Sequence, residues 1–282
     1  MEIKELNHDD ILKMLPDRRN ESHKGDYGKL LFICGSRGYT GAAALSALGA
    51  LRSGAGLVYL AVPESIYEIE ATKLLEPVVF PVPDRDGMLA ESAVEILKDY
   101  IAKVDVILIG PGIGQSDDVT KVVLWTIENY QGPVILDADG INALAQHKDI
   151  LRDRTAPTIL TPHDGEFKRM GGTIKENRLD SAAQLASELG VIVLLKGHRT
   201  VITDNVSTYV NNTGNPGMAV GGSGDILAGI IAALIGQGLA PLEAAACGAW
   251  LHGASGDICS TEIGQYGMLP SDMLTVLPRL LK

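Results

Sequence analysis

The chain has 282 residues, of which 46% are hydrophobic and 21% are charged; this is ordinary for a globular enzyme and long enough for one large α/β domain. Its formal net charge is −11 and its basic residues are scattered, which argues against nucleic acid as a partner. It has no signal-peptide-like N-terminus, no apolar run longer than about eleven residues and no CxxC among three cysteines, so we expect a cytoplasmic protein without membrane segments, disulfides or a zinc site.

Short apolar runs alternate with helix-length segments along the chain. Runs of Val, Ile and Leu without polar alternation are typical of parallel strands that are buried on both faces. We predict strands at residues 29–34, 57–62, 104–110, 133–137, 158–161 and 191–196, and helices at 41–54, 90–100, 118–130, 178–189, 224–235 and 242–255. The alternation predicts a doubly wound α/β fold. Residues 81–87 are predicted to form a surface loop and not a linker, so we expect one domain over residues 1–282.

Glycines and polar side chains follow several of the predicted strands. The segments CGSRGYTG, GPGIG, DADGIN, TPHDGEF and KGHRT each come directly after an apolar run. Because open α/β sheets bind ligands beyond the carboxyl ends of their strands, these segments predict the edge at which a site lies.

The stretch TGNPGMAVGGSGD, residues 213–225, is rich in glycine and ends on Asp225, directly before an apolar helix. Glycine loses the most backbone entropy on folding, so its density here indicates positive φ angles or close approach to a ligand. Amides at the start of the helix would suit a phosphoryl group. Asp225 could accept a proton from an attacking hydroxyl, or could only complement the helix dipole. Neither GxxxxGKS/T nor GxGxxG occurs, which argues against a P-loop and a standard dinucleotide domain.

The segment GGSGD followed by an apolar helix resembles the anion-hole and catalytic-base motif of the ribokinase-like superfamily. Further stretches make the chain similar to the ADP/ATP-dependent NAD(P)H-hydrate dehydratases: SHKGDYGKLLFICGS, GAAALSALGALRSGAGLV, GPGIG, LDADGINAL, LTPHDGEFKRM, KGHRTVI and NTGNPGMAVGGSGDILAGIIA. The resemblance implies a ribokinase-like three-layer α/β fold, with a mostly parallel central sheet flanked by helices. It also implies a hydro-lyase that returns (6S)-NAD(P)HX to NAD(P)H, through phosphorylation of the ring hydroxyl by ADP or ATP and loss of phosphate.

The same resemblance implies roles for individual residues. Asp225 matches the catalytic aspartate and also contacts NAD(P)HX. The other positions that match NAD(P)HX contacts are Ala42, Gly112 and His163. The nucleotide contacts are Lys196, Gly197, His198, Arg199, Thr200 and Gly224, and the anion hole consists of Gly222, Ser223 and Gly224.

Several side chains near these positions keep a second interpretation. His163 could instead be a hydrogen-bonded structural residue at a strand end. Asp137 and Asp139 could bind Mg²⁺ or cap the next helix, and Asp139 lies with Asn142 near the same rim. His252 is predicted to be packed core. We expect Mg²⁺ from the phosphate charge alone and leave its ligands unassigned, because Mg²⁺ usually keeps several waters.

The expected partners are small molecules: NADHX or NADPHX, and ADP or ATP. The family forms homo-oligomers, so a homo-oligomer such as a tetramer is expected. Only about 20 residues precede the matching region, so we expect epimerisation of NAD(P)HX by a separate protein. The alternative function is a ribokinase-like kinase of a vitamin-precursor alcohol, hydroxymethylpyrimidine or hydroxyethylthiazole. A non-catalytic nucleotide-binding module is a third hypothesis, but it has no need for a base at Asp225.

Overall fold

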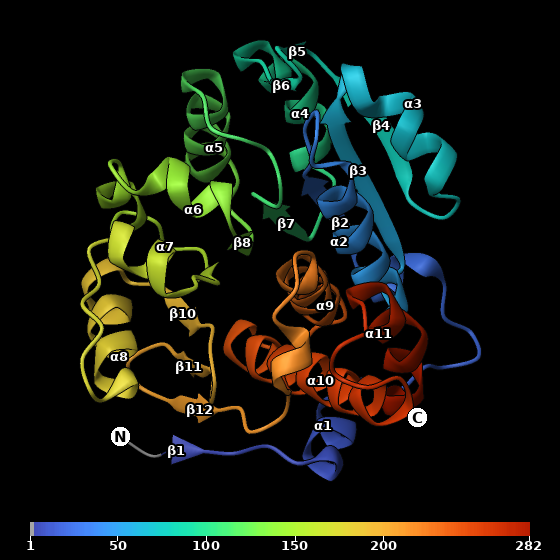
Figure 1. Cartoon of the computed structure of the whole chain (residues 1–282). Helices are drawn as coiled ribbons and strands as arrows, with labels where there is room; N and C mark the ends of the chain where they lie inside the picture. The colour runs from blue at the N-terminus through green and yellow to red at the C-terminus, as the bar shows by residue number, and fades with distance from the viewer. Residues whose placement is uncertain (1–2) are drawn as a thin grey trace.

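The fold is organised around a ten-stranded sheet. Figure 1 shows the computed structural model, which describes residues 3–282. The strand order is β1-β12-β11-β10-β9-β8-β7-β2-β3-β4. Among the described strands of this sheet, only β11 runs against the others. The strands are β1 (Ile3–Lys4), β2 (Lys29–Ile33), β3 (Leu57–Pro63), β4 (Val78–Val82), β7 (Val106–Ile109), β8 (Val134–Leu136), β9 (Thr158–Leu160), β10 (Ile192–Leu195), β11 (Val201–Thr203) and β12 (Thr208–Val210).

Helices cover both faces of the sheet and make a three-layer structure (Figure 1). One face carries α1 (His8–Met14), α2 (Thr40–Arg52), α3 (Glu64–Lys73), α9 (Ser223–Gly236), α10 (Pro241–Glu262) and α11 (Pro270–Val276). The other face carries α4 (Val94–Ile101), α5 (Asp117–Asn129), α6 (Asp139–Leu144), α7 (Asp164–Arg169) and α8 (Arg178–Leu189). Short 3₁₀ helices are η1 (Lys24–Tyr27), η2 (Glu91–Ala93), η3 (Lys148–Leu151), η4 (Pro216–Met218) and η5 (Leu277–Leu281).

The helices on both faces of the sheet explain why the strand sequences are continuous apolar runs. Successive side chains of a strand point to opposite faces, so each strand needs apolar residues at every position. In β2, Leu30 and Phe32 are buried in the core shared with α2 and α9, whereas Leu31 and Ile33 are buried in the core shared with α5. The predicted doubly wound architecture follows directly from this pattern.

The structure corrects the prediction for residues 81–87 and adds an antiparallel strand. Residues 81 and 82 belong to β4, and the predicted loop continues into a hairpin of β5 (Asp84–Arg85) and β6 (Met88–Leu89). Asp86 and Gly87 form its two-residue turn with φ of 55° and 80°, a left-handed conformation that Asp-Gly pairs favour. The predicted parallel pattern also did not include β11, which pairs antiparallel with β10 and β12.

The carboxyl ends of β2 and β7 to β10 are neighbours in the sheet, and the N-terminus of α9 reaches the same edge. The glycine and polar segments predicted to form a site therefore meet there. Within residues 3–282, no helix has the length and apolar character needed to cross a bilayer.

Candidate active site

The N-terminus of α9 presents free backbone amides. Gly222 caps the helix with a φ of 99°, and no side chain caps the first turn. In the part of the chain that the structure describes, the amides of Gly222, Gly224 and Asp225 have no acceptor, whereas Ser223 donates its amide to the carbonyl of Val220 over 3.3 Å. Free amides at the positive end of a helix suit a phosphoryl group. Of the three residues expected to form the anion hole, only Ser223 donates its amide to another group among residues 3–282.

The hydroxyl of Ser223 is held by a buried histidine of α10. The Oγ atom of Ser223 lies 3.1 Å from Nε2 of His252, and both side chains are almost completely buried. Burial lowers the pKa of His252 to about 4, so the imidazole is neutral at neutral pH. His252 is buried as predicted, and its hydrogen bond also fixes the first residue of α9.

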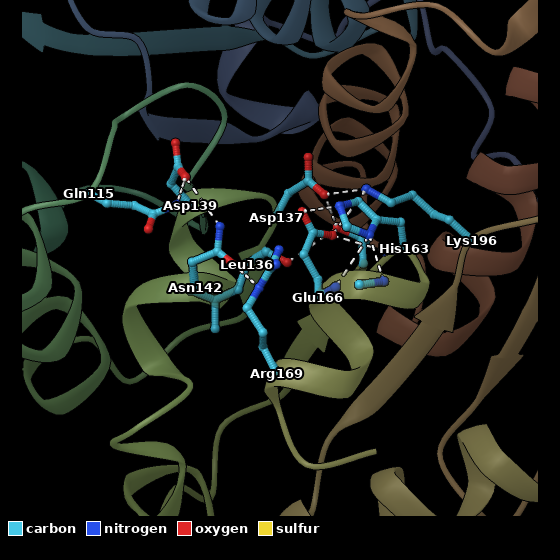
Figure 2. A network of polar contacts seen from close by, with 11 residues as sticks. Gln115, Leu136, Asp137, Asp139, Asn142, His163, Glu166, Arg169 and Lys196 are labelled. Carbon is cyan, nitrogen blue, oxygen red and sulfur yellow. Dashed lines mark hydrogen bonds and ion pairs between the residues drawn. The ribbon is translucent and has the colours of Figure 1, made fainter. Parts of the chain in front are cut away.

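Asp225 lies in a charged centre with one lysine and two more carboxylates. The Nζ atom of Lys196 lies 2.8 Å from Oδ1 of Asp137 and 3.9 Å from Oε2 of Glu166. Thr161 donates its hydroxyl to the same Oδ1 of Asp137 over 2.7 Å. Figure 2 shows Lys196, Asp137 and Glu166 converging from different strand ends and from α7. Two strand ends and two helix starts therefore build this centre together.

The charged side chains of this centre shift one another's pKa values. Burial and, to a smaller extent, the nearby Asp137 raise the pKa of Asp225 to about 6, although Lys196 opposes the rise. Although burial opposes the charged form of Lys196, Asp137 and Glu166 raise its pKa on balance, so the ammonium is kept. A carboxylate with a pKa near neutrality at an anion-binding helix end is the arrangement that a general base requires.

The side chain of Lys196, for which the resemblance implied a nucleotide contact, lies close to the first turn of α9. A Cβ atom at Gly224 would lie 3.4 Å from Nζ of Lys196 and 3.9 Å from Oδ2 of Asp137. The side chain of Lys196 therefore reaches the start of α9. The rest of the predicted nucleotide segment, Gly197 to Thr200, forms the turn between β10 and β11.

That turn is closed by its own side chains and is open to solvent. Thr200 donates its hydroxyl to the carbonyl of Gly197 over 2.9 Å, and the amide of Gly197 donates to Oγ1 of Thr200 over 3.3 Å. His198 and Arg199 are exposed, and Arg199 forms an ion pair with Glu5. Backbone groups of an exposed turn beside the charged centre are available to a nucleotide.

His163 has a structural role in the protein and also keeps part of its ring open to a ligand. Its Nδ1 atom accepts hydrogen bonds from the amides of Gly165 and Glu166, which caps the first turn of α7. Its Nε2 atom lies 3.2 Å from Oε1 of Glu166, and the ring is about half exposed. Because Nδ1 accepts, the neutral ring carries its proton on Nε2. The ring is thus positioned by α7 and still open to a ligand.

Ala42 and Gly112 come from distant parts of the sequence and lie in direct contact. A Cβ atom at Gly112 would be 2.8 Å from Cβ of Ala42 and 2.9 Å from Cβ of Tyr39. Gly112 has a φ of 64°, and its carbonyl accepts the hydroxyl of Ser36 over 2.7 Å. The structure thus joins the GPGIG loop to the start of α2, which brings two of the predicted NAD(P)HX contacts together.

Asp137 and Asp139 have separate roles, although they are two residues apart. Asp139 accepts hydrogen bonds from the amide of Gly114, from Gln115 and from Asn142, at 3.0 to 3.2 Å. Figure 2 shows this cluster apart from the contacts of Asp137. Asp139 therefore holds the GPGIG loop against α6, and only Asp137 belongs to the charged centre. Neither aspartate is the residue that caps α6, which is Ala138.

Some residues of the centre were not singled out from the sequence. Glu166 and Thr161 lie within the quoted TPHDGEF segment but carried no predicted role. Arg178 donates to the carbonyl of Lys196 and to Asp164, both over 2.8 Å, and so ties the predicted nucleotide turn to the His163 segment. The position of Glu166 and Thr161 within TPHDGEF could have indicated a role in the site, but nothing in the sequence indicates one for Arg178.

Comparisons with known proteins show which family and which solved structures this chain resembles. A family model described as NAD(P)H-hydrate dehydratase matches residues 30–279. The bifunctional NAD(P)H-hydrate repair enzyme Nnr of Moorella thermoacetica is 45% identical over 274 residues, which are 95% of this chain and 52% of that protein. The chain spans about half the length of the first curated relatives that it matches.

Two solved structures are similar over almost the whole chain. A ribokinase-like superfamily protein from Enterococcus faecalis V583 has a TM-score of 0.88 and 29% identity, and the match covers 99% of this chain and 95% of that one. The ADP/ATP-dependent NAD(P)H-hydrate dehydratase from Bacillus subtilis, co-crystallised with ATP and Mg²⁺, has a TM-score of 0.81 and 32% identity over 97% and 96% of the two chains. The ribokinase-like fold predicted from the sequence is confirmed.

Proposed function

Because this chain belongs to the NAD(P)H-hydrate dehydratase family, we propose that it converts (6S)-NAD(P)HX back to NAD(P)H with ADP or ATP as co-substrate. The observation that carries the proposal is the position of Asp225 beside the free amides at the start of α9 and the ammonium of Lys196. The pKa of Asp225 is about 6. These groups supply what phosphoryl transfer to an alcohol needs: a base, an anion hole and a positive charge.

Asp225 acts in the first step. Its carboxylate takes the proton of the ring hydroxyl, and the hydroxyl oxygen attacks the terminal phosphorus of the nucleotide. The free amides of Gly222, Gly224 and Asp225 hold the oxygens of the migrating group. Lys196 stays charged beside them and offsets the negative charge that develops.

The second step is loss of phosphate. The bond between the ring carbon and the phosphate oxygen breaks, and its electron pair leaves with the phosphate. A proton leaves the neighbouring ring carbon, and the ring double bond of NAD(P)H returns. Phosphorylation thus turns hydroxide, a poor leaving group, into a good one. The nucleotide ends one phosphate shorter, and inorganic phosphate is released.

The residues present fit a magnesium ion held mainly by nucleotide phosphates. Within residues 3–282, no group of three or more His, Cys, Asp or Glu side chains is placed to hold a metal ion. Oδ1 of Asp137 is already bonded to Lys196 and Thr161, so Oδ2 is the oxygen left for a cation. Three carboxylates against one lysine leave excess negative charge beside a polyphosphate. Bound Mg²⁺ would neutralise that charge, with Asp137 as its protein ligand or as the acceptor of a bound water.

The wider setting of the reaction is also part of the proposal. The first relatives are named bifunctional repair enzymes and are about twice as long as this chain, so we propose that a second repair activity, an epimerase, works alongside it. Cys34, Cys247 and Cys259 are free and buried, which supports a reducing compartment such as the cytoplasm. We keep the homo-oligomer as a proposal drawn from the family.

The test is recovery of the reduced cofactor. The purified protein is mixed with NADHX or NADPHX, Mg²⁺ and either ADP or ATP, and the reduced-nicotinamide absorbance and released phosphate are followed together. We expect about one phosphate for each NAD(P)H formed. Failure of both nucleotides with both substrates would overturn the proposal. Hydroxymethylpyrimidine and hydroxyethylthiazole are tested in parallel, and a stable phosphorylated alcohol would identify a vitamin-precursor kinase instead.

A further inference from the structure

A polar cleft lies beside the proposed active site, between α5, α6 and α7. Its volume is about 530 Å³, which is in the range of small-molecule sites. These helices follow β7, β8 and β9, so the cleft opens at the same edge of the sheet as the charged centre. Its lining includes the side chains of Gln115, Asn142, Gln146, His147 and Arg169, all of which can form hydrogen bonds.

The guanidinium of Arg169 has no carboxylate partner among the residues that the structure describes. In the described part of the chain its one hydrogen bond runs from Nε to Oδ1 of Asn142, over 2.8 Å. Asp117 also lines the cleft but forms no ion pair with Arg169 within those residues. A guanidinium has five N–H donors in a planar fork, so the remaining donors are free for a phosphate, which matches that fork.

Hydrogen bonds connect Arg169 to the loop proposed to contact NAD(P)HX. Asn142 accepts from Arg169 and donates to Asp139 over 3.2 Å. Asp139 in turn accepts the amide of Gly114 and the side-chain amide of Gln115, both over 3.0 Å, as Figure 2 shows for the labelled side chains. The orientation of the guanidinium is therefore set by the same aspartate that holds the GPGIG loop.

The segment that carries His163, another proposed contact of the substrate, also comes close to this arginine. The Nη1 atom of Arg169 would be 3.9 Å from a Cβ atom at Gly165, two residues after His163. The turn after β10, which we propose for ADP or ATP, takes no part in lining the cleft. The cleft thus begins near the proposed NAD(P)HX contacts and not at the nucleotide turn.

From this arrangement we propose that the cleft binds the adenosine half of NAD(P)HX and that Arg169 contacts one of its phosphate groups. The inference rests on the proposed function. The phosphate is either the diphosphate bridge, which NADHX and NADPHX share, or the 2′-phosphate, which only NADPHX carries. The amide and imidazole side chains of the cleft would hydrogen-bond the ribose and the adenine.

The test compares Arg169→Gln with Lys168→Gln. Lys168 is the neighbouring exposed cation on α7 and does not line the cleft, so the control removes the same charge from the same helix. Steady-state constants are measured with NADHX and NADPHX, and dissociation constants of NADH and NADPH are measured by fluorescence. We expect Arg169→Gln to raise KM and the dissociation constants about 10- to 100-fold with little change in kcat, as for loss of a charged hydrogen bond, and Lys168→Gln to leave them unchanged.

Each outcome has a defined meaning. Weakening with both dinucleotides supports the cleft and places the diphosphate at Arg169, whereas weakening with NADPHX and NADPH alone supports it and places the 2′-phosphate there. Equal constants for Arg169→Gln and Lys168→Gln overturn the inference, as does a rise in KM for ADP or ATP alone. If the wild-type protein forms no NAD(P)H, the proposed function fails, and the fluorescence measurements still decide whether the cleft binds a dinucleotide.

Discussion

The proposed chemistry depends on the carboxyl group of Asp225. We expect Asp225→Asn to reduce kcat about 10²- to 10⁴-fold, the usual contribution of a general base, because the amide cannot take the hydroxyl proton. Asp153→Asn is a matched control, since Asp153 is exposed and makes no hydrogen bond within the described residues. The rate of NAD(P)H recovery measures both variants. Near wild-type turnover in Asp225→Asn would show that Asp225 has another role.

The pKa of Asp225 also predicts the pH dependence of the enzyme. Burial raises this pKa from 3.8 to about 6, so the base is ionised at neutral pH and becomes protonated below about pH 6. We expect kcat to fall about tenfold per pH unit on that acid limb. A profile of kcat between about pH 5 and pH 8 checks this, and a flat profile down to pH 5 would contradict it.

Neighbouring charges should move that acid limb in opposite directions. Lys196 lowers the pKa of Asp225 and Asp137 raises it. Lys196→Met should therefore shift the limb to higher pH, and Asp137→Asn should shift it to lower pH, whatever the loss in maximal rate. The shift is read from pH profiles normalised to their own maxima. Shifts of the same sign in both variants would mean that a different group titrates.

At the scale of elements, α2 and α9 hold the site together through a close crossing. A Cβ atom at Gly229 of α9 would lie 2.1 Å from the carbonyl oxygen of Ser46 of α2, and one at Gly49 would lie 2.8 Å from the carbonyl oxygen of Ile226. Backbone cannot move aside as a side chain can, so the two helices approach closely only with glycine at these positions. Their crossing fixes Asp225 relative to Ala42.

We expect Gly229→Ala to lower the free energy of unfolding by about 2–3 kcal/mol, because the added methyl group forces the helices apart. Gly41→Ala is the matched control in α2: its Cβ position is open and its φ is negative, so the substitution should be neutral or stabilising by up to about 0.5 kcal/mol. Urea unfolding compares the two. Similar stabilities for both variants would mean that α2 and α9 can separate without cost.

The elements that the sequence predicted well are those with a continuous apolar pattern. The apolar helix predicted over 224–235 agrees with α9 (Ser223–Gly236) within one residue, and all six predicted strands exist within one or two residues of the structure. Elements with a mixed pattern were missed. Strand β4 has exposed Val78 and Pro81 at the edge of the sheet, and α3 buries only Ile66 and Glu70 of its ten residues. Such elements gain their stability from neighbours that the sequence alone does not reveal.

The candidate site was predictable where local backbone geometry demands a special residue. The glycines at 222 and 112 have positive φ, so the sequence marks them. Lys196 was predicted as a nucleotide contact, but its ammonium lies beside Asp137, fifty-nine residues away in the chain. Contacts of this kind depend on strand order, as do those of Glu166 and Arg178, and strand order is not readable from periodicity.

At the scale of the whole molecule, the active site reduces the stability of the fold. Asp225 is about two pKa units less acidic in the folded protein than its ordinary value of 3.8, so the folded state binds its proton more tightly than the unfolded state does. The contribution of this group is fully present below about pH 4 and is lost as the pH rises through 6. At neutral pH the charged carboxylate therefore lowers the free energy of unfolding, on the order of 1–2 kcal/mol after allowance for its partial exposure.

Asp225→Asn should accordingly be more stable than the wild type while being nearly inactive. We expect its advantage in the free energy of unfolding to increase from about pH 4 to about pH 7 by on the order of 1–2 kcal/mol, because the amide has no charge to desolvate. Urea unfolding at several pH values measures this, with Asp153→Asn as the control that should show no such increase. An advantage that is constant with pH would mean that burial does not penalise the Asp225 carboxylate, and the acid limb of kcat would then belong to another group.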